Sequence, residues 1–247
     1  MFNLKLHPFE VSANFKLSLV LTYSFKSESL KDFIPECLEL DTLNGDTGFM
    51  AAAFVQTENL RPRILPEILG EDFILIGYRI FVRYKTSYGK RLRGLYILKS
   101  ETDKIRMKIG GNLFTNYNYS KTDIKFSESS DLINIVSEKS GINIKAEVLD
   151  GYEGLPAESP FKDIKEARRF SGPLPFTFSY LKDSDEMLIV EGVRSNWKPK
   201  PVKIIESEIK FINSIDSGKG KLANAFLVKD TPYYWKKGIK DKILKRE

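Results

Sequence analysis

The strongest constraint on the fold is a stretch in which every second residue is apolar. Residues 15 to 25 read FKLSLVLTYSF, and the alternate positions hold Phe15, Leu17, Leu19, Leu21, Tyr23 and Phe25. Successive side chains of a β-strand point to opposite faces, so this spacing predicts a strand with one buried face. It is the clearest strand in the sequence.

Strand-like segments continue along the chain and are separated by turn-rich ones. Residues 73 to 85 and 91 to 99 form the longest pair, and apolar side chains on both faces of the first predict that it is covered on both sides. Short helices are expected over residues 29 to 34, over 101 to 109 before Gly110 and Gly111, and over 161 to 170 after a cap at Ser159. About ten to twelve strands with about two or three helices predict a mainly β (α+β) fold, a large antiparallel sheet curled into a barrel.

Length and charge predict one domain with a basic tail. The 247 residues are 42% hydrophobic, which is enough for one large core over residues 1 to 237. The net charge is +6, and residues 236 to 247 supply +4 of it through six Lys or Arg against Asp241 and Glu247. We therefore expect residues 238 to 247 to form a solvated basic tail. Basic and acidic residues are interleaved elsewhere, so no nucleic-acid partner is expected.

The sequence also predicts no membrane segment and a cytoplasmic location. The longest uncharged apolar runs, FILIG and FMAAAFV, are much shorter than the roughly 20 residues that span a bilayer. Residues 1 to 20 lack the continuous apolar core of a signal peptide. The single cysteine, Cys37, excludes an internal disulfide and fits a reducing compartment.

Motifs for metal, phosphate and dinucleotide binding are missing. His7 is the only histidine, so neither a histidine-based catalytic triad nor a multi-histidine metal site can be built. No GxxxxGK[ST] or GxGxxG motif is present. We expect no metal and no cofactor.

The remaining candidates are polar and aromatic residues on predicted strands. Tyr117, Tyr119 and Lys121 would share one face of a strand. Inside an apolar barrel the ammonium group of Lys121 would be desolvated, its pKa would fall, and it could act as a Schiff-base nucleophile. Alternatively this face is solvated, since Asp123 and Lys125 continue it.

Three arginines leave a similar choice open. Arg79 and Arg83 lie in an otherwise apolar strand, and inward-pointing guanidinium groups would bind a carboxylate through paired N–H donors. Outward-pointing groups would only pair with acids of a neighbouring strand. Arg194, before the NWKPKP segment, could reach into the barrel beside Arg79 or stack on Trp197.

Several stretches together resemble the DUF2071 family, whose members resemble acetoacetate decarboxylase in fold. They are LIGYRIFVRY, RLRGLYILKSET, LFTNYNYSKTDI, ARRFSGPLPFTFSY, VEGVRSNWKPKPV and NAFLVKDTPYYW, and the resemblance covers roughly residues 7 to 237. It implies a cone-like antiparallel β-barrel with helices on its outside. The decarboxylases carry a Lys-Lys pair that forms the Schiff base, and the corresponding residues 114 to 121 lack it. Lys121 lies a few residues too late, so Schiff-base decarboxylation is not expected.

Two functions are therefore carried forward. In the first, Arg79, Tyr96, Tyr117, Tyr119, Lys121 and Arg194 line a barrel cavity for a small organic anion, a keto acid or another carboxylate. In the second, the chain is a non-enzymatic interaction protein or homo-oligomer. Exposed Tyr233, Tyr234 and Trp235 would then form the contact surface, and the basic tail would bind an acidic partner.

Overall fold

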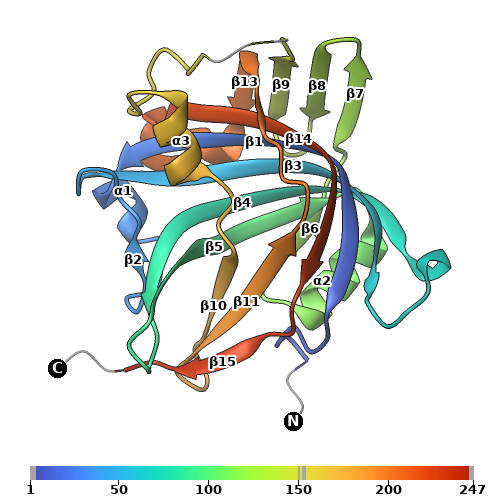
Figure 1. The fold of residues 1–247 in the computed structure, drawn as a ribbon, viewed down its shortest axis with the longest axis vertical. Coiled ribbons are helices and arrows are strands. Elements are labelled where there is room, and N and C mark those ends of the chain that lie inside the picture. Colours follow the sequence, from blue (N-terminus) through green and yellow to red (C-terminus); the bar gives the residue numbers. More distant parts are fainter. Residues whose placement is uncertain (1–3, 150, 152–153, 245–247) are drawn as a thin grey trace.

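The computed structural model describes residues 4–149, 151 and 154–244, which form two β-sheets with short helices around them (Figure 1). The strands are β1 (Val11–Lys26), β2 (Glu39–Leu40), β3 (Thr47–Pro62), β4 (Glu71–Lys85), β5 (Arg91–Thr102), β6 (Tyr119–Lys121), β7 (Lys125–Ser129), β8 (Leu132–Ser137), β9 (Ile142–Glu147), β10 (Phe176–Leu181), β11 (Glu186–Arg194), β12 (Lys200–Pro201), β13 (Lys203–Ile209), β14 (Lys221–Trp235) and β15 (Ile239–Lys242). The helices are α1 (Glu28–Lys31), α2 (Ile105–Phe114), α3 (Ile164–Ser171) and α4 (Lys210–Asn213), and η1 (Glu67–Leu69) and η2 (Ile215–Gly218) are 3-10 turns.

The larger sheet closes on itself. Its strands follow the order β14, β1, β3, β4, β5, β10 and β11, and β14 also pairs with β11, so the ring has no open edge between these strands (Figure 1). All ring pairings are antiparallel except that of β5 with β10. This confirms the mainly β, cone-like barrel with peripheral helices. None of the helices among the described residues has the length and apolarity that crossing a membrane requires.

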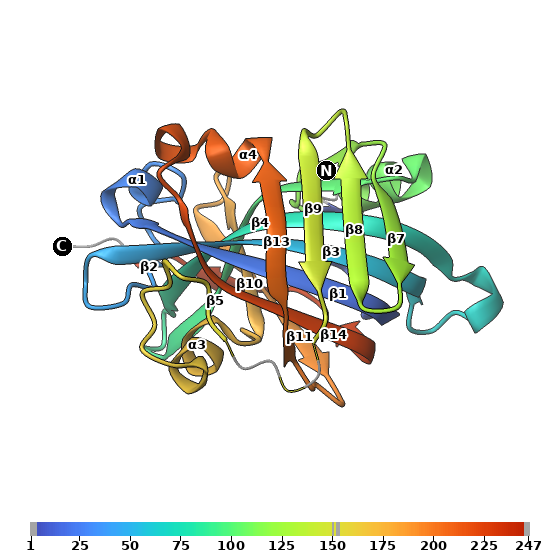
Figure 2. The same cartoon turned by 90° about the horizontal axis from the view of Figure 1, so that it is seen from above.

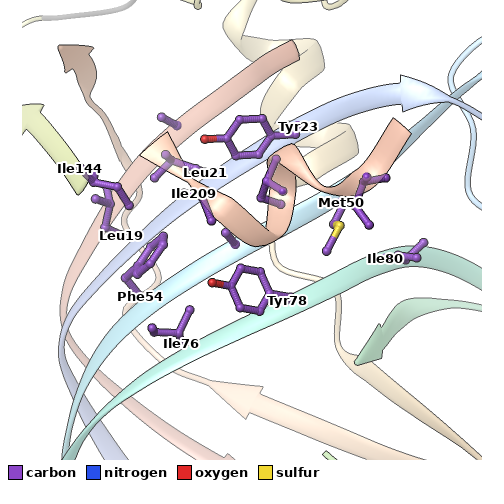
Figure 3. Packing of buried hydrophobic residues seen from close by; sticks show 14 of the residues in the cluster. Leu19, Leu21, Tyr23, Met50, Phe54, Ile76, Tyr78, Ile80, Ile144 and Ile209 are labelled. Carbon is purple, nitrogen blue, oxygen red and sulfur yellow. The ribbon is translucent and has the colours of Figure 1, made fainter. Parts of the chain in front are cut away.

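A second sheet covers one outer face of the barrel. It has the order β13, β9, β8, β7 and lies across β1 and β3 (Figure 2). Ile144 of this sheet packs in the same cluster as Leu19 and Phe54, and α4 lies over Tyr78, whose ring is 4.5 Å from that of Phe211 (Figure 3). The other face of β4 points into the ring, so both faces of β4 are covered, as predicted.

A bulge divides β1, and the expectation that Phe15 shares a face with Leu17 was wrong. Phe15 pairs with Thr57 whereas Leu17 pairs with Gln56, so the register shifts by one residue at Lys16. A shift of one residue moves the side chains to the opposite face. Leu17 consequently packs beneath the second sheet, and Phe15 packs with the residues that face into the ring.

The neighbouring strand β14 changes face at the same level. Asp230 has a φ of 46°, a conformation outside regular strands. Beyond it, Tyr233 and Trp235 pack against Phe15, with ring centroids 4.8 and 5.8 Å from the phenyl ring. These aromatics, expected on an exposed contact surface, therefore lie partly buried against the barrel interior.

The predicted bounds of two helices were wrong. Helix α2 begins at Ile105, because residues 101 and 102 belong to β5, and it continues through Gly110 and Gly111 to Phe114. Glycine does not end it because Gly111 is a packing site: a Cβ there would lie 2.4 Å from the ring of Tyr119. Helix α3 begins at Ile164 after Asp163, which accepts a hydrogen bond from the Glu166 backbone, and not after Ser159.

The expected basic tail is ordered in its first part. Residues 239 to 242 form β15 on β11. Asp241 is buried there and accepts hydrogen bonds from the Tyr84 hydroxyl at 2.6 Å and from the Ser87 hydroxyl at 2.5 Å. Strand β15 is thus hydrogen-bonded through Asp241 to Tyr84 and Ser87 at the hairpin between β4 and β5. Residues 245 to 247 lie outside the described residues.

Candidate functional site

Arg79 on β4 points into the ring. It follows the alternation of β4, in which Ile76 and Tyr78 face the second sheet and Leu75 and Arg79 face inward. Burial lowers the pKa of Arg79, and the charge of Arg194 lowers it further. Its Nε is buried without a hydrogen-bond partner, and no described residue forms an ion pair with the guanidinium. By surface area the side chain is only partly buried, but an arginine with a buried Nε and no counter-charge is still uncommon, because an unpaired charge is costly to desolvate.

Gly77 makes room for this side chain. Gly77 precedes Arg79 by two residues, so it faces the same way. A Cβ at Gly77 would lie 2.8 Å from Nη2 and 2.9 Å from Nε of Arg79, closer than carbon and nitrogen atoms approach. The guanidinium group is therefore folded back along its own strand over a bare backbone.

Three tyrosines lie close enough to the guanidinium group to affect the pKa of Arg79. Tyr117 lies between α2 and β6, Tyr119 begins β6 and Tyr233 comes from β14; they pack in one cluster with Leu75, which faces the same way as Arg79. Burial raises the pKa of Tyr119 to about 12 and also raises that of Tyr117, which a hydrogen bond with Thr177 lowers to a smaller extent. Both hydroxyls consequently stay protonated at neutral pH. Each can donate a hydrogen bond to an anion.

Arg194 brings a second positive charge to the same interior. It lies between two aromatic rings, with its guanidinium carbon 5.2 Å from the centroid of Trp197 and 5.4 Å from that of Tyr233. One nitrogen donates to the Leu174 carbonyl oxygen at 2.9 Å. Both alternatives for Arg194 thus hold: it reaches inward and it stacks on Trp197. Because it is fixed by these contacts, it is less free than Arg79 to clamp a ligand.

The structure brings together four of the six predicted site residues, namely Arg79, Tyr117, Tyr119 and Arg194. It does not bring Tyr96 and Lys121 to them. Tyr96 packs in the cluster beneath the second sheet, and Lys121 is exposed at the end of β6. Arg83, the other inward candidate, donates to the buried carboxylate of Asp41 at 2.6 Å.

Tyr233 and Gly77 are the site residues that sequence reasoning missed. The alternation along β14 is broken at Asp230, so the direction of Tyr233 could not be read from spacing. Pro232 is a usable signal, because proline within a strand marks an edge or a bulge. Gly77 in a strand interior likewise marks the close approach of another group.

The interior of the ring is rich in hydrogen-bond donors. Two guanidinium groups and three tyrosine hydroxyls offer donors, and no carboxylate is hydrogen-bonded to Arg79 among the described residues. Among the described residues, no cluster of three or more His, Cys, Asp or Glu side chains could hold a metal ion.

Sequence comparisons identify the family of the chain and one relative. A model of the DUF2071 family, described as uncharacterized conserved protein, matches residues 13–214. The uncharacterized protein YqjF of Bacillus subtilis (strain 168) is 34% identical over 111 residues, which are 44% of this chain and only 43% of that protein.

Similar solved structures include acetoacetate decarboxylases. The acetoacetate decarboxylase of Legionella pneumophila has a TM-score of 0.59 at 13% identity, over 93% of this chain and 86% of that one. Another acetoacetate decarboxylase structure gives 0.60 at 12%, over 95% and 91%. An acetoacetate decarboxylase-like enzyme from Sphingomonas wittichii RW1 gives 0.55 at 12%, over 95% and 93%. At these identities the likeness shows the fold alone.

Proposed function

Since the chain belongs to the DUF2071 family and has the acetoacetate decarboxylase fold, we propose that it binds a small organic anion, a keto acid or another carboxylate, inside its barrel. The observation that carries the proposal is the guanidinium group of Arg79, whose Nε is buried without a hydrogen-bond partner and which has no ion-pair partner among the described residues.

A carboxylate is the ligand that this arrangement fits. A guanidinium group binds a carboxylate through two parallel N–H donors, and these charge-assisted bonds are stronger than neutral ones. Tyr117 and Tyr119 add neutral donors whose raised pKa keeps them protonated. The anion would supply the counter-charge that the protein itself does not place beside Arg79.

Covalent catalysis through lysine is not part of the proposal. A Schiff base needs a desolvated amine with a lowered pKa next to the substrate carbonyl. Lys121 is exposed, and the groups that act on Arg79 are tyrosines and Arg194. We therefore propose anion binding without an imine intermediate.

Thermal unfolding in the presence of small anions tests the proposal. Acetate, pyruvate, acetoacetate and methanesulfonate would be compared with glycerol, in the wild type, Arg79→Met and the control Lys121→Met. A ligand at a hundred times its Kd adds about 2.7 kcal/mol, which raises the Tm of a chain of this size by about 5–10 °C. We expect this rise in the wild type and in Lys121→Met only. The proposal fails when no anion stabilises the wild type, or when Arg79→Met responds equally.

A further inference from the structure

A cavity of about 200 Å³ lies next to the anion site, between the N-terminal segment, α2 and the ends of β1 and β3. Its wall is mostly apolar and includes Val11, Leu60, Met107, Phe114 and Trp235. The segment from His7 to Phe9 and helix α2 form one side of it, and the His7 backbone donates to the Phe114 carbonyl oxygen at 2.9 Å.

Two tyrosines form a wall that this cavity shares with the anion site. Tyr117 and Tyr119 line the cavity and pack in one cluster with Leu75, which faces into the ring on the same side of β4 as Arg79; Arg79 itself does not line the cavity. Trp235 also lines it, and its ring lies 4.5 Å from that of Tyr233, another neighbour of Arg79. A molecule whose anionic group binds Arg79 can therefore extend along these rings into the cavity.

The charged residues of the wall are Arg61, Glu71 and Arg106. Arg61 is held by the Asn59 and Leu65 carbonyl oxygens and by Glu67, and Arg106 is exposed to solvent. Burial lowers the pKa of His7, which keeps its imidazole neutral at pH 7. Most of the remaining wall is apolar, so the cavity favours an apolar group.

We propose, resting on the anion site proposed above, that the natural ligand is a carboxylate with an apolar body of about the size of a phenyl ring, and that this body fills the cavity beside α2. An apolar protein cavity of about 150 Å³ binds benzene, so a cavity of about 200 Å³ accommodates a group of that size.

Gly110 offers a way to fill the cavity without disturbing the anion site. It lines the cavity from α2, and a Cβ at this position would meet no heavy atom within 4 Å. Replacing a glycine within a helix also raises helix propensity. Gly110→Leu should therefore fold, and its side chain would occupy the space meant for the apolar body.

Titration calorimetry with acetate and phenylacetate tests the inference in four proteins: wild type, Gly110→Leu, Arg79→Met and Ile109→Phe. The last is the matched control, because Ile109 precedes Gly110 on α2, is 62% exposed and lies outside the cavity wall. In the wild type and in Ile109→Phe, phenylacetate should bind at least about tenfold more tightly than acetate. Gly110→Leu should lose this preference and keep its affinity for acetate.

The outcomes separate the two proposals. Equal affinities of the wild type for both ligands, or an unchanged preference in Gly110→Leu, overturn the role of the cavity. When Arg79→Met nevertheless loses both ligands in that case, the anion site stands without it. When the wild type binds neither carboxylate, both proposals fail.

Discussion

The guanidinium group of Arg79 lies over Gly77, and a Cβ on that glycine would be 2.8 Å from Nη2. This contact joins a residue without a side chain to the arginine that points from β4 into the ring. The position of the charge therefore depends on two residues. Arg79 supplies the guanidinium group, and Gly77 leaves the space that the group occupies.

Gly77→Ala should therefore weaken carboxylate binding by at least about tenfold, because the guanidinium group must move away from its place between the tyrosines. Titration calorimetry of the single variant, of Arg79→Ala and of the double variant measures the coupling between the two positions. In the Arg79→Ala background, Gly77→Ala should raise the free energy of unfolding by about 0.5 kcal/mol, since a strand interior disfavours glycine. Equal affinity of Gly77→Ala and wild type would refute the arrangement.

Arg79→Met should raise the free energy of unfolding of the ligand-free protein by about 1–3 kcal/mol. The apolar side chain has a similar volume and removes an unpaired buried charge. Urea unfolding at pH 7 measures the change.

Arg83→Met is the control for that experiment. It lies four residues further along β4, and its loss leaves the buried carboxylate of Asp41 to Arg93 alone. It should lower stability by about 1–3 kcal/mol. Destabilisation of equal size in both variants would show that Arg79 is paired after all.

Lys121 should form no adduct with keto acids. Because its side chain is exposed on β6, nothing desolvates the ammonium group in the way a Schiff-base nucleophile requires. Incubation with acetoacetate or pyruvate and sodium borohydride, followed by mass measurement, should give the unmodified chain. A mass increase that disappears in Lys121→Arg would contradict the non-covalent account.

Asp241 should govern part of the stability of the protein in acid. Burial by itself raises the pKa of this carboxyl group, but hydrogen bonds from Ser87 and Tyr84 outweigh it and lower the pKa overall. The native state thus favours the charged form, and its contribution is present above about pH 4, the unfolded pKa, and is lost as the pH falls through the lower native pKa.

Asp241→Asn should consequently lower the free energy of unfolding at pH 7 by about 1–3 kcal/mol and flatten its decline below pH 4. Urea unfolding between pH 7 and pH 3 gives both quantities. Asp183→Asn, in an exposed turn, is the control and should follow the wild type. An acid decline as steep as that of the wild type would show that Asp241 does not contribute to it.

The sequence predicts the barrel well and its irregularities poorly. Alternation identifies β1 and β4, and the resemblance of six stretches to one family identifies the architecture. Alternation cannot reveal where a strand changes face. Phe15 and Tyr233 point into the ring because of the bulges at Lys16 and Asp230. The boundaries of α2 depend in the same way on a tertiary contact, that of Gly111 with Tyr119.

The candidate site could be predicted only in part for the same reason. Polar groups on otherwise apolar strands indicate Arg79 and Tyr119 as candidates, but their convergence depends on the closure of the ring through β14 and β11. By its spacing, Lys121 should share a face with Tyr119, yet it is exposed where β6 ends. Alternation along a short strand such as β6 therefore does not predict whether the residue at its end is buried.

A crystal structure determined with a saturating carboxylate tests the central claim most directly. We expect the carboxylate to accept two N–H bonds from Arg79 at about 2.7–2.9 Å, with Tyr117 or Tyr119 donating a further bond. A carboxylate bound elsewhere while Arg79 keeps only water, or a protein group paired with its guanidinium, would contradict the account.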